Sequence, residues 1–218
     1  MNRSFASRLW ATGLLLMATL VVNAPGVAEE TPKEWDTTQA RGQTRDIDFD
    51  TTEGTWMNVD ASPDGKWIVF DLLAHIYRMP AIGGKAECLT QDSGVALNMN
   101  PRFSPDGKTI AFVSDRKGQN NLWLMDADGK NPHAVFTDKG KRVLSPVWTP
   151  DGRFIVVQQQ VLKPGEGDFN WSLVMYHKDG GNGIELVNKD KAAGWHSLSR
   201  DGKYLYAFAS ESAPSRMS

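Results

Sequence analysis

The sequence predicts an all-β fold built from repeated four-stranded antiparallel units. Three observations carry this prediction. A five-residue turn motif returns four times, each copy is followed by a short apolar run rich in β-branched and aromatic residues, and further glycine turns lie between the copies. The 20 glycines and 8 tryptophans among 218 residues favour many short strands joined by turns over helices.

The turn motif recurs at nearly constant spacing. Its copies are Ser62-Pro63-Asp64-Gly65-Lys66, Ser104-Pro105-Asp106-Gly107-Lys108, Thr149-Pro150-Asp151-Gly152-Arg153 and Ser199-Arg200-Asp201-Gly202-Lys203, with aspartates 42, 45 and 50 residues apart. Proline presets φ, aspartate bonds to the backbone N–H groups that follow it, and glycine accepts positive φ. Each copy is therefore expected to be a structural hairpin turn, because a position repeated in every unit behaves as scaffold and not as a single active site.

Four strands are expected in each unit, in a fixed order around these turns. The first strand precedes the motif and the second follows it, while a glycine turn separates the third from the fourth. The expected second strands are 67–70, 109–113, 154–157 and 204–208; the third strands are 76–79, 122–125 and 173–176; the fourth strands are 86–90, 133–137 and 184–187. Four antiparallel strands in 40 to 50 residues match one blade of a β-propeller. A helical repeat would show a period of 3.6 residues, which these runs lack.

The segments outside the repeats are expected to have separate roles. Residues 1–28 have the n-region, uncharged apolar run and small-residue site of a signal peptide, with cleavage after Ala28 and a periplasmic or secreted product. The alternative is an uncleaved anchor, but the run from Leu9 to Val22 is shorter than the roughly 20 residues that cross a bilayer. Residues 29–50 form an N-terminal extension, 51–210 the blades and 211–218 a truncated tail.

The fourth unit supplies only two strands, at 195–198 and 204–208. We therefore expect about three and a half blades, which is an incomplete ring, because closed propellers usually have four to eight blades. The alternative is a small four-bladed ring in which residues 30–50 provide the missing outer strands.

These residues resemble a known family. TolB-type propeller repeats are what these features look like, over roughly residues 50–210: the Ser-Pro-Asp-Gly-Lys turn, the strand Ile110-Ala111-Phe112, Ser114-Asp115-Arg116 and the stretch Asn121 to Gly129. The opening segment, from Thr52 to Asp60 and on into Trp67 to Leu73, is similar to the N-terminal propeller of secreted bacterial amidohydrolases. That resemblance implies a non-catalytic propeller followed by a missing hydrolase domain acting on amide C–N bonds. A divalent metal such as zinc is then expected only in the missing domain, and no cofactor in this chain.

Two other functions stay open: a periplasmic TolB-like scaffold that binds proteins, and the propeller of a prolyl-oligopeptidase-like serine peptidase. The expected partner is a protein or a covalently fused catalytic domain. The formal charge of −2 argues against nucleic acid as a partner, and no segment after the leader is apolar enough to cross a membrane.

Residues that could carry chemistry are few and scattered. The four histidines, His75, His133, His177 and His196, lack the paired spacing of metal ligands, so none is expected to bind metal. Cys88 is expected to be a thiol in an outer strand and not a nucleophile. The run from Asp126 to Asn131 lacks the closing glutamate of a calcium loop and is expected to be a hairpin turn.

The remaining polar and aromatic positions have ordinary interpretations. Asp115, Arg116, Gln119 and Asn120 are expected in a solvated loop that could contact a partner. Five tryptophans at comparable strand positions are expected to pack between blades: Trp67, Trp123, Trp148, Trp171 and Trp195.

Overall fold

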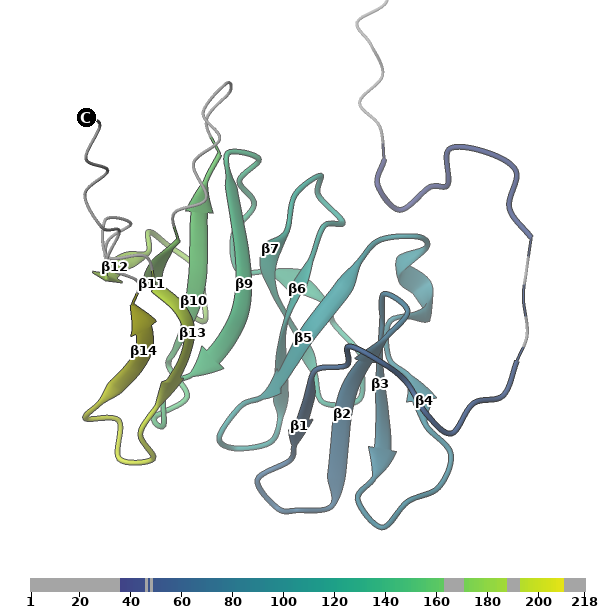
Figure 1. Ribbon diagram of the computed structural model, residues 1–218, viewed down its shortest axis with the longest axis horizontal. Coiled ribbons are helices and arrows are strands. Elements are labelled where there is room, and N and C mark those ends of the chain that lie inside the picture. Colours follow the sequence, from purple (N-terminus) through teal and green to yellow (C-terminus); the bar gives the residue numbers. More distant parts are fainter. Residues whose placement is uncertain (1–35, 46, 48, 163–170, 188–192, 210–218) are drawn as a thin grey trace, which may run out of the picture. The chain divides into compact units, whose positions relative to one another are not determined.

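The computed structural model describes residues 36–45, 47, 49–162, 171–187 and 193–209 (Figure 1). These residues all belong to one compact unit, Trp35–Ser218. Strands dominate this part of the chain, and the helical element described in it is a short 3-10 turn, η1 (Gln91–Ser93). The predicted all-β fold is confirmed.

The strands form three four-stranded antiparallel sheets and one two-stranded sheet, each in chain order. The first sheet comprises β1 (Val59–Ala61), β2 (Trp67–Leu72), β3 (His75–Pro80) and β4 (Glu87–Cys88). The second comprises β5 (Asn98–Phe103), β6 (Thr109–Ser114), β7 (Asn121–Asp126) and β8 (His133–Ala134). The third comprises β9 (Lys141–Trp148), β10 (Phe154–Val161), β11 (Ser172–His177) and β12 (Ile184–Val187), and the fourth pairs β13 (Ala193–Leu198) with β14 (Leu205–Ala209). We call these sheets the first to fourth blades.

The outer strands β4 and β8 are shorter than the sequence predicts. In the first blade, Leu89 still donates its N–H to the Ile76 carbonyl over 2.8 Å, but the next donor, the N–H of Ile76, is bound by the Thr90 hydroxyl at 2.9 Å. A side chain thus replaces the backbone acceptor that would extend the ladder, and the strand ends at Cys88.

The core lies between successive blades because alternate residues of a strand point to opposite faces of its sheet. On β6, Ile110 and Phe112 pack in a cluster with Val69 of the first blade, while Ala111 and Val113 pack in another with Ile155 of the third. All six side chains are fully buried. The second blade is therefore covered on both faces.

The fourth blade is covered on one face. Its residues Leu198 and Leu205 pack against Val156 and Leu173 of the third blade. The opposite face of β14 and the preceding turn presents Tyr204, Tyr206 and Phe208, which are 61%, 60% and 67% exposed. Positions equivalent to Tyr206, such as Ala111 and Val156, are buried by the blade that follows them.

The prediction that the recurring tryptophans pack between blades holds for Trp123 and Trp148, which are 6% and 8% exposed. It is wrong for Trp195, which is 88% exposed. The reason is a bulge: the register of β13 against β14 shifts between Gly194 and His196, so Trp195 has no cross-strand partner there.

The alternative of a four-bladed ring closed by residues 30–50 is not supported in the described part of that segment, since residues 36–45, 47 and 49–50 contain no strand. The predicted signal peptide, cleavage site and tail at 211–218 lie outside the described residues. Among the residues that the structure does describe, no helix is long and apolar enough to span a membrane.

Candidate functional site

The four motif turns share one hydrogen-bond pattern. In the first turn, the Ser62 hydroxyl donates to the Asp64 carboxylate at 2.7 Å and accepts the N–H of Trp67 at 2.9 Å. The same carboxylate oxygen accepts the N–H of Lys66 at 3.1 Å. The second, third and fourth turns repeat these bonds, with Thr149 replacing serine in the third.

This pattern keeps the turn carboxylates ionised. Hydrogen bonds from the Ser or Thr hydroxyl, followed by the backbone N–H of the basic residue, lower the pKa of Asp64, Asp106 and Asp201. In the third turn, the Thr149 hydroxyl and the Arg153 N–H and guanidinium lower the pKa of Asp151 to about 2. The hydroxyls and carboxylates are thus engaged within their own turns.

The turn prolines and glycines also connect neighbouring blades. The motif glycines have backbone φ angles of 70°, 71°, 67° and 71°, which residues with a Cβ rarely adopt. A Cβ on Gly107 would lie 3.4 Å from the ring of Pro63, one on Gly152 3.7 Å from Pro105, and one on Gly202 3.3 Å from Pro150. Each proline therefore packs beside the glycine of the next blade's turn, a contact that the spacing of the motif does not reveal.

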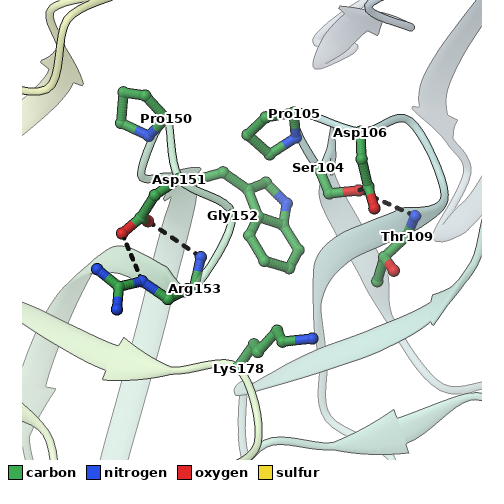
Figure 2. Close-up of a pocket in the computed structure, with 10 residues that line it drawn as sticks. Ser104, Pro105, Asp106, Thr109, Pro150, Asp151, Gly152, Arg153 and Lys178 are labelled. Atoms are coloured by element: carbon green, nitrogen blue, oxygen red, sulfur yellow. Dashed lines mark hydrogen bonds and ion pairs between the residues drawn. The ribbon is translucent and has the colours of Figure 1, made fainter.

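Two grooves lie between the turns of neighbouring blades. The first groove, between the first and second blades, is lined by residues including Pro63, Trp67, Arg78, Phe103 and Ala127. The second groove, between the second and third blades, is lined by residues including Pro105, Thr109, Trp148, Arg153 and Lys178 (Figure 2). Each encloses about 420 Å³. They occupy equivalent places one blade apart.

In the first groove, the chain itself engages the terminal nitrogens of the cation Arg78, while its buried Nε–H has no hydrogen-bond partner among the described residues. The Arg78 guanidinium lies 4.4 Å from the centroid of the Trp67 ring, pairs with the Glu87 carboxylate at 3.0 Å and donates to the Ala127 carbonyl at 2.7 Å. A charge stacked, paired and hydrogen-bonded in this way has little capacity left for a ligand.

In the second groove, one cation is left without a partner. Arg153 is paired with Asp151 at 2.7 Å, and both belong to the same turn. The Lys178 side chain has no hydrogen bond or ion pair with any residue in the described part of the chain, although its backbone N–H is bound to the Arg153 carbonyl at 3.0 Å. Sequence reasoning did not single out Lys178, because the groove is formed by residues far apart in the chain.

The histidines lie apart, each in a different blade. The Nδ1–H of His133 donates to the Asn131 carbonyl at 2.9 Å, and His177 lies edge-on to Phe154. Nε2–H of His196 donates to the Val156 carbonyl at 3.2 Å, while its buried Nδ1 has no partner, and burial lowers the pKa of the ring. Within the described ranges, no three His, Cys, Asp or Glu residues cluster as a metal site would require.

Cys88 lies in the outer strand β4, as predicted, and is half-buried. Burial raises the pKa of its thiol, but hydrogen bonds with His75 and at the Thr90 backbone more than offset this and lower it. The same bond from Cys88 raises the pKa of His75. The sequence did not predict this pairing, because 13 residues separate the two side chains.

The loop between β6 and β7 is tied to the protein. The Asp115 carboxylate accepts the N–H of Leu97 at 2.8 Å, and Arg116 donates twice to the Asn98 amide oxygen, at 3.2 and 2.9 Å. Gln119 accepts the N–H of Asn120. The run from Asp126 to Asn131 is a hairpin turn, as predicted, with Asn131 bound to the Asp126 carboxylate at 2.7 Å.

Comparisons with known proteins agree with this architecture. Tol-Pal system protein TolB of Francisella tularensis is 33% identical over 166 residues, covering 53% of this chain and 37% of its own length. The uncharacterized peptidase YuxL of Bacillus subtilis is 40% identical over 76 residues, covering 34% of this chain and 11% of its own length. The chain thus spans well under half the length of these curated relatives.

Solved structures show the same fold. One assigned to TolB of Agrobacterium tumefaciens matches with a TM-score of 0.57 and 27% identity, over 72% of this chain and 60% of that one. A prolyl endopeptidase structure matches with a TM-score of 0.54 and 18% identity, over 70% of this chain and 25% of that one, which supports the fold alone. The family described as the TolB beta propeller domain (PD40) matches residues 43–204. Because this match covers most of the sequence, the chain belongs to the TolB β-propeller domain family.

Proposed function

We propose that this chain is an exported, non-catalytic propeller segment that acts by binding a protein. The observation that carries the proposal is that its hydroxyl and carboxylate side chains at the blade junctions are bound in the same structural turn four times. An active site needs a group displayed once, with a base beside it and a preorganised site for the developing charge. A turn that is repeated in every blade instead forms part of a surface that a protein partner can contact.

Similarity to TolB supports protein binding at an envelope location, since that relative is named as a component of the Tol-Pal system. The apolar leader supports export. A surface made of turns on a rigid sheet scaffold is a common arrangement for recognition.

A second candidate is that the segment supports a fused hydrolase domain, restricting access to it or packing beside it. An amidohydrolase is proposed only from the opening segment, Thr52 to Asp60 with the following Trp67 to Leu73. A peptidase is favoured by the 76-residue alignment with the peptidase YuxL, which is 40% identical. The gene sequence beyond codon 218 discriminates between them: a His-x-His motif after further blades supports the amidohydrolase, and Gly-x-Ser-x-Gly supports the peptidase.

The test has a catalytic arm and a binding arm, both on residues 29–218. Amide, dipeptide and ester hydrolysis, with and without zinc, should not exceed the buffer control. Turnover that His196→Ala abolishes would contradict the proposal, because His196 carries the one buried, unpartnered ring nitrogen among the described histidines.

For the binding arm, a photocrosslinking amino acid replaces Lys178, which lines the second groove, in one variant and Leu73, in the turn between β2 and β3, in another. Both side chains are exposed, so both variants should fold. A discrete protein adduct at either position in envelope extracts supports protein binding. Absence of any adduct at both positions contradicts it.

A further inference from the structure

We propose that the second groove binds an extended peptide segment of a protein partner, with an acidic side chain on Lys178 and a neighbouring apolar side chain between the turn prolines. This inference deepens the proposed protein-binding function and rests on it. It names the place and the chemistry, which neither the family match nor the relatives assign.

The first groove is an internal reference for the second, because the backbone fixes which positions correspond. Arg78 pairs across its ladder with Glu87, and the corresponding pair in the second blade is Leu124 with His133. The first groove's Arg78–Glu87 ion pair therefore has no counterpart in the second blade.

The cation of the second groove comes from the next blade instead. The N–H of Ala127 bonds to the Lys108 carbonyl at 2.9 Å, and that of Lys178 bonds to the Arg153 carbonyl at 3.0 Å, so Lys178 holds the place of Ala127. An ammonium thus lines the second groove where the first has a methyl group, and no carboxylate of the described residues is paired with it.

The other charges of the second groove are already engaged. Asp151 and Arg153 neutralise each other, and the Asp106 carboxylate accepts bonds from the Ser104 hydroxyl at 2.6 Å and the Lys108 N–H at 3.1 Å. Among the described residues that line this groove, Asp106 is the negative charge without a paired cation, and its two bonds hold it in its own turn. Lys178 is therefore the cation of this groove that can bind a carboxylate of a ligand.

Apart from the hydroxyl-bearing residues Ser104 and Thr109, the rest of the lining is apolar. Pro105 and Pro150 belong to adjacent turns, and the indole N–H of Trp148 is committed to the Arg102 carbonyl at 3.2 Å, so this ring offers carbon and no free donor. A volume of about 420 Å³ is within the range of pockets that hold small ligands or a few side chains. A carboxylate beside an aromatic or aliphatic side chain matches this combination.

The experiment uses residues 29–218 labelled with nitrogen-15 and two matched peptides, acetyl-Gly-Glu-Phe-Gly-amide and acetyl-Gly-Gln-Phe-Gly-amide. Titration should move the amide signals of Gly152, Arg153 and Lys178. The glutamate peptide should bind about two- to fivefold more tightly than the glutamine peptide, the range of an exposed ion pair. Lys178→Ala should remove this preference and Lys178→Arg should keep it.

Lys66→Ala is the control variant, because Lys66 is also exposed but pairs with Asp64 and lines neither groove. It should leave both affinities unchanged. Equal affinity for the two peptides, or a glutamate preference that survives Lys178→Ala, would overturn the inference. Signal shifts centred on Gly107 and Arg78 of the first groove would also overturn it, as would the absence of saturable shifts at peptide concentrations up to about 10 mM. If it is overturned while crosslinked adducts still form, protein binding stands and uses another surface.

Discussion

The motif glycines provide a matched series that measures what each turn requires. Gly65, Gly107 and Gly152 have φ of 70°, 71° and 67°, so alanine at each position would be held in the same left-handed conformation. That conformation costs a residue with a Cβ about 1–2 kcal/mol, and part of the cost is offset because alanine restricts the unfolded chain. We expect a loss of about 1 kcal/mol for each single substitution.

The surroundings of the added Cβ should matter little in this series. Nothing lies within 4 Å of it at Gly65, and the nearest proline carbons lie 3.4 Å away at Gly107 and 3.7 Å away at Gly152, which are ordinary contact distances. The three losses should therefore agree within about 0.5 kcal/mol. Gly42→Ala is the control, since its Cβ meets nothing within 4 Å and its φ is not in the left-handed region.

Urea unfolding followed by tryptophan fluorescence gives the free energies of unfolding. The melting temperature of each of the three variants should lie about 2–4 °C below that of the parent chain. If Gly65→Ala is as stable as the parent chain, the left-handed turn is not required and the structural interpretation of the motif fails. If Gly107→Ala costs far more than Gly65→Ala, the contact with Pro63 is tighter than the structure indicates.

Three further predictions follow. In mass spectrometry of the envelope fraction, the N-terminal residue of the protein should be Glu29, and recovery from the cytosol of a chain that retains Met1 would contradict export. Because burial lowers the pKa of His196 below its usual 6.5, the unfolded state binds more protons, so stability should fall as the pH drops below about 6.5; His196→Gln should flatten this pH profile, and an unchanged slope would exclude the ring as its source. The exposed aromatic face of β14 should drive self-association in sedimentation velocity, which Tyr206→Lys should reduce, whereas a clean monomer at high concentration would show that this face is covered.

The sequence was sufficient to predict the repeats because their signals are local. Pro63, Asp64 and Gly65 act within one turn, and a short run rich in β-branched and aromatic residues follows each turn, so the turns and most second and third strands lie where expected. The outer strands were overestimated because a threonine hydroxyl, which sequence patterns do not place, takes the position of a backbone acceptor in β4. Trp195 was misassigned because a bulge interrupts the period of its strand.

The candidate site could not be predicted in the same way. Lys178 and Pro105 meet at one groove although 73 residues separate them, and their proximity depends on how one blade stacks on the next. The self-paired Arg78, which makes the first groove differ from the second, depends on a contact with Ala127 across the same junction. Neither contact has a signature in sequence spacing.

Hydrogen exchange of the purified chain, resolved by residue, tests most directly the claim that successive blades bury one another in a stack. Amides of β6 and β7 should exchange more slowly than those of β13 and β14, because the second blade is covered on both faces and the fourth blade on one. Equal protection of β14 and β6 would contradict the account, since it would mean that the face carrying Tyr206 and Phe208 is buried.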